Sequence, residues 1–578
     1  MPRGLKDSEI IQFLEEEEEA IDSASENEQD HDVIVSDHVT ESEQSENESN
    51  DQWRSEDEVP LQNLASSSQS HDQSFYLGKN RLTKWYKHPP RSMVRTQRSN
   101  IVTETAGPKG PARDIMTLSD AFLSIFSRET VDLILTYTNE YIISIQNNFQ
   151  RERDCKVVSY EELLAFFGLL YMSGVLRSSH LNYQDLWAAD GTGIEFFSNT
   201  MSCKRFLFIL RSLRFDSRTT REVRQSLDKL AAIRDFCNLM NDNFQKCYSM
   251  SENVTIDEQL PAFRGRFCGV VYMPSKPTKY GIKHFALVDS ATYYLQRFEV
   301  YVGVQPDGPF KLPSDTKSLV KRLIEPISGT GRNVTMDNWF TSVPLAKSLL
   351  DEHTLTMVGT LRKNKPEIPK CFLPEKKRET TSSIFGFQKD MTLCSYVPKP
   401  RKAVMLLSTM HHDDNVEGEK RKPEIIHFYN KTKGGVDTND QMCATYNVGR
   451  RTKRWPMVIF FHIFNITGIN SYVIYKSKID SNISRRLFLK LLAVDLVKPH
   501  QMSRASIPTL PRPLQKRLKR QHEIQDQVSI PEAGRSQSYK RCHVCPRSKD
   551  RKTKTECFKC HKHVCNDHMN IVCKNCND

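Results

Sequence analysis

The sequence lacks an apolar run long enough to span a bilayer. Its two longest, residues 163–176 and 457–469, fall short of the roughly 18 residues that a spanning helix needs. The first residues run into "LEEEEE", a pattern foreign to secretory signals. We therefore expect an intracellular chain with no membrane partner, in which both apolar runs are buried core helices.

Basic residues are scarce at the start of the chain. Residues 1–60 hold 21 Asp and Glu against 3 Lys and Arg, whereas the other 518 residues hold 50 acidic and 79 basic side chains. Residues 1–95 are also poor in apolar side chains, so we expect a disordered acidic arm, followed by a basic linker over 96–114. A basic body behind an acidic arm indicates binding to a polyanion such as nucleic acid.

Cysteines are sparse until the last 37 residues, which hold seven of the fifteen. Pair-spaced cysteines in an intracellular chain indicate a metal rather than disulfides, and eight ligands in four pairs suffice for two tetrahedral zinc ions. The short gaps favour a crossed pairing, although a sequential one stays open. RING and PHD modules also cross their pairs, so a ubiquitin ligase or a chromatin reader is an alternative. The crossed pairing assigns one ion to Cys542, Cys545, Cys565 and His568, and the other to Cys557, Cys560, Cys573 and Cys576.

Hydrophobic periodicity divides the middle of the chain. Apolar residues at three- and four-residue spacing predict helices over 115–252 and over 447–500. Alternation from residue 253, then helix–strand–helix–strand to residue 362, indicates a mixed sheet with helices packed on it. The sequence thus predicts a multidomain α+β protein. Its remaining parts are expected to be an insertion over 363–425, a return to the sheet unit over 426–446, a linker over 501–539 and the zinc unit over 540–578.

Three acids stand at structural junctions inside the basic body. Asp257 ends the strand-like "NVTIDEQ", Asp337 ends "NVTMDN", and Asp437 follows a Gly-Gly pair at the start of a predicted helix. Nucleases place two hard cations about 3.5–4 Å apart around the reacting phosphate, and Mg²⁺ or Mn²⁺ prefers carboxylate oxygens. The three acids are therefore candidate metal ligands that would meet DNA through the metal. An Asp at such a junction is also a common cap or turn residue, which is our interpretation of Asp289.

Asp440 and Trp339 each have two readings. Asp440 lies one helical turn beyond Asp437, so it either assists a metal or is stabilised by the helix dipole. Trp339, two residues beyond Asp337, either stacks on an unpaired base or belongs to the core.

Basic side chains near the acids and in the tail are candidate DNA contacts, because phosphate contacts position a duplex without reading its sequence. They are Lys276, Lys279 and Lys283 after the first strand, Arg450, Arg451, Lys453 and Arg454 before the last helices, and Arg547, Lys549, Arg551 and Lys552 in the zinc unit.

Several long stretches resemble the piggyBac transposase family in order and spacing. They are "TIDEQL", "FRGR", "YMPSKPTKYGIK", "VTMDNWFTSVPLAKSLL", "VGTLRKNKPEIP", "YNKTKGGVDTNDQM" and "RRTKRWPM". The resemblance implies a ribonuclease-H-like catalytic core, a helical DNA-binding and dimerization domain split around it, and a zinc domain that binds transposon ends. It also implies a catalytic triad of Asp257, Asp337 and Asp437 with Mg²⁺ or Mn²⁺, and Asp440 as a further acid near it.

The function implied by this resemblance is cut-and-paste transposition at TTAA targets, with hairpin ends and seamless excision. We accordingly expect a nuclear homodimer that acts on double-stranded DNA and takes no small-molecule substrate. The alternative is a domesticated relative that binds DNA or chromatin without cutting. The complete triad and the complete set of zinc ligands favour the active enzyme, since the loss of one acid would have favoured the alternative.

Overall fold

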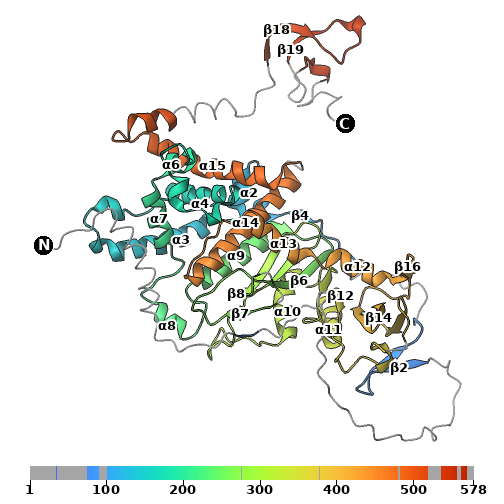
Figure 1. Cartoon of the computed structure of the whole chain (residues 1–578). Helices are drawn as coiled ribbons and strands as arrows, with labels where there is room; N and C mark the ends of the chain where they lie inside the picture. Colours follow the sequence, from blue (N-terminus) through green and yellow to red (C-terminus); the bar gives the residue numbers. More distant parts are fainter. Residues whose placement is uncertain are drawn as a thin grey trace, which may run out of the picture.

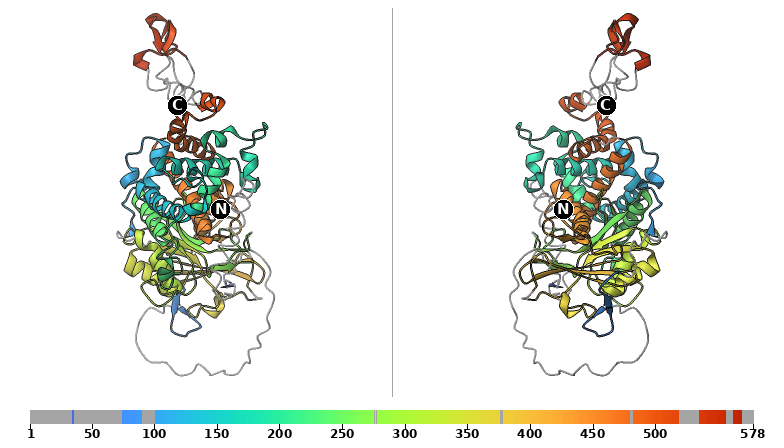
Figure 2. Two further views of the ribbon diagram at one scale, coloured as in Figure 1. Left: turned by 90° about the vertical axis from the view of Figure 1, so that its left-hand side faces the viewer. Right: turned by 90° about the vertical axis from the view of Figure 1, so that its right-hand side faces the viewer.

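The computed structural model describes residues 34–35, 74–89, 100–274, 276, 278–375, 378–479, 482–518, 535–555 and 562–568. In Figure 1 a body of helices lies above a large mixed sheet, and the strands of the predicted insertion lie to the right. Figure 2 shows from both sides that early (blue to green) and late (orange) helices intermix above the strands. The fold class predicted from the sequence, a multidomain α+β protein with a mixed sheet, is confirmed.

The central sheet has ten strands in the order β10-β9-β6-β11-β12-β15-β14-β13-β3-β2. Three inner strands run parallel to one another: β6 (Asn253–Gln259), β11 (Asn333–Met336) and β12 (Thr356–Thr360). β9 (His284–Asp289) and β10 (Leu295–Val300) extend the sheet beside β6 as antiparallel strands. Of the acids expected at strand ends, Asp257 therefore lies in a central strand and Asp337 directly follows one.

Helices α10 (Thr316–Ile324) and α11 (Val343–His353) pack against this part of the sheet. Each helix starts at a side-chain cap, Asp315 for α10 and Ser342 for α11, which accepts a hydrogen bond from a backbone N–H of the first turn. Their apolar faces share one buried cluster with the strands, built from residues such as Ile256, Val334, Leu323 and Leu349.

The helical body joins segments from before and after the sheet. Its main helices are α2 (Leu118–Ile125), α3 (Arg128–Ile145), α4 (Tyr160–Val175), α7 (Cys203–Ser212), α9 (Arg234–Cys247), α14 (Trp455–Lys478) and α15 (Arg485–Ala505). Phe464 of α14 stacks on Tyr171 of α4 with ring centroids 4.3 Å apart. A Cβ on Gly168 would lie 2.8 Å from the carbonyl oxygen of Ala493, so a glycine lets α4 and α15 approach closely.

α14 is longer than its apolar run suggested and, by length and composition alone, could cross a membrane. Within the protein, 89% of its most apolar 18-residue window is buried. Core helices of soluble proteins pass the same test, so we interpret α14 as the central helix of the helical body.

Residues 74–89 form a β-hairpin, so the expectation of disorder through residue 95 is wrong for this segment. β2 (Phe75–Leu77) pairs with β3 (Lys84–Tyr86), and β3 pairs with β13 (Ser383–Phe387) of the insertion. Trp85 is fully buried, and its Nε1 donates to the carbonyl of Glu367 at 2.8 Å. One buried aromatic side chain thus anchors a segment of polar average composition.

The segment expected as a basic linker is also packed where it is described. β4 (Gly107–Pro108) pairs with β5 (Tyr248–Ser249). Arg332, which precedes β11 and is 1% exposed, donates to Glu104 at 3.0 Å. Residues 100–108 therefore run over the surface at the amino ends of the parallel strands, and within 100–112 only Ala112 is buried.

The insertion continues the sheet of the core. β13 (Ser383–Phe387), β14 (Thr392–Lys399) and β15 (Lys402–Ser408) are antiparallel, and β15 pairs with β12. In the tail, β18 (Arg535–Arg541) pairs with β19 (Lys552–Thr555).

Candidate metal centres

Asp257 and Asp337 lie side by side on adjacent parallel strands. β6 and β11 pair with Ile256 opposite Met336, so the next residue on each chain is one of the two acids. β6 continues to Gln259, so Asp257 lies within the strand and not at its end as the sequence suggested. Asp337 follows β11 directly, and its Oδ1 accepts a hydrogen bond from the N–H of Trp339 at 2.9 Å.

The end of α12 (Glu424–Thr432) is hydrogen-bonded across both strands. Oγ1 of Thr255 donates to the carbonyl of Thr432 at 2.7 Å, and the hydroxyls of Thr335 and Thr432 lie 2.7 Å apart. Because side chains alternate along a strand, these two threonines share a face with the acids two residues further on. The chain leading into the third acid is therefore tied to the strands that carry the first two.

α13 (Gly435–Thr445) begins directly over β6. A Cβ on Gly435 would lie 2.6 Å from Oγ1 of Thr255, so a larger residue would push the helix away. Asp437 falls in the first turn of α13 and Asp440 one turn later. A helix dipole acts mainly within the first turn, so it stabilises Asp437 more than Asp440. The structure thus weakens the helix-dipole reading of Asp440.

These acids share one electrostatic environment. Burial raises the pKa of Asp257 well above its usual range, and the charge of Asp337 adds to the effect. Burial also raises the pKa of Asp440, with a contribution from Asp437, while Lys276 opposes both shifts. A divalent cation relieves repulsion of this kind, and a set of carboxylate oxygens suits Mg²⁺ or Mn²⁺. The acid cluster, defined as Asp257, Asp337, Asp437 and Asp440, is therefore a candidate site for such a metal.

A buried polar network fixes α13 against β6. Nε2 of Gln259 donates to Oδ1 of Asn439 at 2.9 Å, and Nδ2 of Asn439 donates to the carbonyl of Tyr293 at 2.8 Å. Asn439 lies between the two acids of α13, so these bonds set the position of both. This pair was not predicted from the sequence, although the two-residue spacing from Asp257 to Gln259 places both side chains on one strand face.

Two buried histidines complete the network. Nε2 of His462 lies 3.1 Å from Oε1 of Gln259, and the rings of His462 and His284 are 4.9 Å apart. Burial lowers the pKa of His284 to about 4 and that of His462 well below its usual range, so both are neutral at pH 7. No motif in the sequence marks these residues.

The three lysines predicted to bind DNA beside the acids differ in their surroundings. Nζ of Lys276 lies 3.8 Å from Oδ1 of Asp437. Lys279 is exposed, whereas Lys283 is 4% exposed with its Nζ 5.7 Å from the ring centre of Trp339. Lys283 is therefore not placed for the DNA contact predicted from the sequence, because protein encloses its ammonium group.

Trp339 is half-buried and packs against the core, which favours the second of its two readings. Its ring stacks on Phe285 with centroids 5.5 Å apart, and Phe340 packs edge-on at 4.7 Å. The side chain thus supports the turn that carries Asp337.

The basic run before α14 alternates between inward and outward side chains. Arg450 stacks on Tyr183 at 3.8 Å, and Arg454 donates to two carbonyls at the end of α7 at 2.9 and 2.6 Å. Arg451 and Lys453 are exposed. The inward pair holds the helical body together, and the outward pair remains accessible to phosphate.

The cysteine-rich tail brings together one of the two predicted ligand sets. The ligand atoms of Cys542, Cys545, Cys565 and His568 all lie within 4.8 Å of one another. Sγ of Cys545 is 3.6 Å from Sγ of Cys565, and Nδ1 of His568 is 3.3 Å from the latter. Three sulfurs and one nitrogen suit a tetrahedral zinc ion, and the first and third pairs meet as crossed pairing requires.

The second predicted ligand set, Cys557, Cys560, Cys573 and Cys576, lies outside the described residues. The basic residues of the tail, Arg547, Lys549, Arg551 and Lys552, are exposed, and Arg551 forms an ion pair with Asp567.

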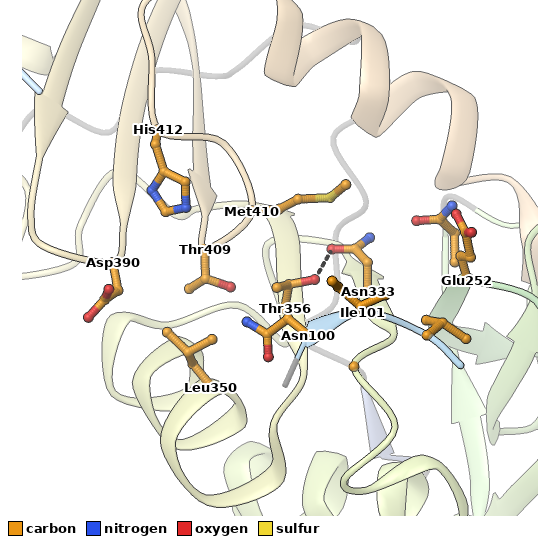
Figure 3. Close-up of a pocket in the computed structure, with 13 residues that line it drawn as sticks. Asn100, Ile101, Glu252, Asn333, Leu350, Thr356, Asp390, Thr409, Met410 and His412 are labelled. Atoms are coloured by element: carbon orange, nitrogen blue, oxygen red, sulfur yellow. Dashed lines mark hydrogen bonds between the residues drawn. The ribbon is translucent and has the colours of Figure 1, made fainter. Parts of the chain in front are cut away.

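A cavity of about 370 Å³ opens at the opposite, amino ends of the same parallel strands. Figure 3 shows Asn333 hydrogen-bonded to Thr356, with Asn100 beside Thr356, on one side of the cavity and Asp390 and His412 of the insertion on the other. The cavity contains none of the predicted site residues. The acid cluster therefore lies at a different edge of the sheet from this cavity.

Known proteins resemble the chain in sequence and in structure. Residues 118–472 match a family profile described as transposase IS4. The human PiggyBac transposable element-derived protein 3 is 21% identical over 395 residues, a match that covers 65% of this chain and 64% of that protein. The human chimeric ERCC6-PGBD3 protein is also 21% identical, over 36% of its length, so the matches span less than two thirds of either relative. The cryo-EM structure of a piggyBac transposase synaptic complex with hairpin DNA superposes with a TM-score of 0.68 at 34% identity, covering 82% of this chain and 100% of that chain.

Proposed function

Since the chain belongs to the piggyBac-type transposase family, we propose that it is a metal-dependent DNA transposase of the DDD type. It cuts the strands at the ends of a mobile element and joins them to a new target. From the family and from the DNA complex of the structural relative, we further propose TTAA target sites, hairpin ends and seamless excision.

One observation carries this proposal. Asp257, Asp337 and Asp437 come from segments 80 and 100 residues apart, yet pairing of β6 with β11 and packing of α13 gather them at one edge of the sheet. Caps and turn residues have no reason to converge in this way. Asp289 supports the contrast, because it is fully buried and its carboxylate accepts bonds from the N–H groups of Ser251, Ala291 and Thr292, as a turn residue does.

The residues divide the work at this edge. The triad would hold the metal, which would activate the attacking oxygen and stabilise the leaving one. The N–H of Trp339 orients the carboxylate of Asp337, and the Gln259–Asn439 bond keeps α13 in place. The exposed Lys279, Arg451 and Lys453 position the backbone of double-stranded DNA through its phosphates.

The tail supplies a second, structural use of metal. We propose two zinc ions, one held by the observed cluster and one by the remaining four cysteines, with the exposed basic residues around them binding the transposon ends. A nuclear homodimer is the proposed working form, as two ends must be handled together.

The alternative is a domesticated protein that binds DNA without cutting it. The human relative, named as a transposable element-derived protein, favours considering this alternative. The two functions separate in one experiment. A marker gene flanked by the genomic DNA on either side of the coding region is co-expressed with the chain, and excision is scored by sequencing the repaired donor.

The expected result is precise repair to TTAA with wild type and none with Asp337→Asn. Asp307→Asn is the matched control, because Asp307 is 93% exposed and pairs only with Lys311 in the described contacts. DNA binding without excision by the wild type would favour the domesticated alternative.

A further inference from the structure

Lys276 points a single ammonium group into the acid cluster. It lies between β7 (Val270–Tyr272) and β8 (Tyr280–Ile282), in a turn closed by hydrogen bonds from the N–H of Lys276 to Met273 (3.2 Å) and from the N–H of Met273 to Lys279 (2.8 Å). Its Nζ is 3.8 Å from Oδ1 of Asp437, and its side chain is only 18% exposed. The turn therefore places the ammonium group beside Asp437, whose side chain is 68% exposed, while little of the Lys276 side chain itself faces solvent.

Four carboxylates act on this ammonium group. The charges of Asp257, Glu258, Asp437 and Asp440 outweigh the effect of burial, and together they raise the pKa of Lys276 above its usual value. Clustered carboxylates repel one another, and a cation among them offsets that repulsion. In the metal-free chain Lys276 supplies this cation.

A divalent cation bound by the same acids would carry a second positive charge into the space that this ammonium group occupies. The two cations compete for one set of oxygens, so binding of the metal must drive the ammonium group out of the cluster. Lysine carries its charge on a flexible four-carbon side chain, so the displaced ammonium group can move to another nearby anion. Beside a nuclease site, that anion is a DNA phosphate.

We propose that Lys276 is an exchangeable counter-cation: it occupies the acid cluster before metal arrives, is displaced by the metal, and then binds a DNA phosphate. This inference rests on the proposed function and adds to it a coupling between two ligands. Because coupling between sites is reciprocal, metal raises the affinity for DNA, and DNA raises the affinity for metal by the same factor. Lys276 is thus a positioning and regulatory residue of the site.

The test titrates zinc-loaded, full-length chain with Mn²⁺ and follows free Mn²⁺ by electron paramagnetic resonance. Without DNA, Lys276→Met should bind Mn²⁺ about tenfold more tightly than wild type, because the competing charge is gone, while Lys276→Arg should resemble wild type. Lys321→Met is the matched control. Lys321 forms an ion pair with Glu352 at 2.6 Å outside the acid cluster, so its removal should leave the Mn²⁺ affinity unchanged.

The second arm repeats the titration with a non-specific DNA duplex. Wild type should gain Mn²⁺ affinity in the presence of the duplex, and Lys276→Met should lose most of that gain. Two results would overturn the inference. One is equal Mn²⁺ affinity of Lys276→Met and wild type without DNA, and the other is a wild-type Mn²⁺ affinity that does not change when DNA is added. The second result is measured on wild type alone, so it does not depend on the folding of a variant.

Asp337→Asn separates this inference from the proposed function. If it binds Mn²⁺ as wild type does, the acids are not the metal site and the proposed function loses its basis. If it loses Mn²⁺ while Lys276→Met matches wild type, the metal site stands and only the role of Lys276 is wrong.

Discussion

The acid cluster and the cysteine cluster are both candidate metal centres, but they are built in opposite ways. The acids lie on strands and a helix whose positions are set by apolar cores and by buried hydrogen bonds such as that between Gln259 and Asn439. In the described part of the tail, the buried apolar cluster consists of Cys542, Cys545, Cys565 and Val564. Three of these four residues are predicted zinc ligands, so this part of the tail has little apolar core apart from the ligands themselves.

This difference separates the two roles of a metal. A site preformed by the fold can bind and release a cation without unfolding, which suits catalysis. A site without a core depends on the ion for folding, which suits a structural zinc. The comparison therefore predicts opposite outcomes when each metal, or a ligand of each, is removed.

Removing zinc should have the largest effect on folding. Zinc supplies on the order of 10 kcal/mol to small domains of this kind. Strong chelation should release two zinc ions per chain and make residues 540–578 sensitive to protease while the helical body stays resistant. Cys565→Ser should do the same, and Cys371→Ser, outside the tail, should not. Release of one ion, or a chelated tail that resists protease, would contradict this prediction.

The triad should behave in the reverse manner, losing chemistry and keeping the fold. Loss of one metal ligand costs several kcal/mol in the transition state, so Asp257→Asn, Asp337→Asn and Asp437→Asn should each lower strand cleavage by at least about 10³-fold. The midpoint of thermal unfolding should stay level or rise, since each variant relieves repulsion among the acids. A midpoint of thermal unfolding that is many degrees below that of wild type would mean that the acid stabilises the fold instead of binding metal.

The histidines under the acid cluster should make the stability of the core depend on pH. Both are neutral in the folded chain and titrate near pH 6.5 when unfolded, so between about pH 4 and 6.5 the unfolded chain binds more protons. The free energy of unfolding should fall as the pH drops through this window, by on the order of 3 kcal/mol for His284 alone.

Urea unfolding at pH 7 and pH 5 checks this. His284→Leu should weaken the pH dependence of the free energy of unfolding, because it removes one of the two titrating imidazoles. Leucine is a suitable replacement, since Nε2 of His284 has no hydrogen-bond partner in the described structure. His427→Gln, at an exposed position, should keep the wild-type dependence. Identical pH dependence in all three proteins would refute the assignment.

Asp440 should give the smallest effect. It lies beside the triad and outside the first turn of α13, so Asp440→Asn should lower strand cleavage by about tenfold, or about 1.4 kcal/mol. Cleavage rates of purified protein on a labelled duplex measure this. Full activity would reduce Asp440 to a buried helix residue without a part in the reaction.

Sequence patterns located the chemistry better than its surroundings. Asp337 and Asp437 stand where strand and helix periodicity placed them, because local chain geometry decides those positions. The partner strands of β6 depend on long-range pairing, which no local pattern encodes. Gln259, Asn439 and the two histidines matter only through those contacts.

Composition also misled in one segment. Residues 74–89 are polar on average, yet Trp85 fits a pocket against the insertion and orders the hairpin. The three lysines after β6 could not be distinguished by sequence. In the folded chain, Lys276 lies beside Asp437, Lys279 is exposed to solvent, and Lys283 lies against the aromatic ring of Trp339.

Iron-directed cleavage of the protein backbone tests the central claim most directly. Fe²⁺ bound in place of Mg²⁺, with ascorbate and peroxide, produces radicals that cut the chain close to the metal, and mass spectrometry maps the cuts. The account predicts cuts near residues 257, 337 and 437 together, and their loss in Asp337→Asn. Cuts elsewhere, or cuts at these segments that persist in Asp337→Asn, would show that the three acids do not form a metal centre.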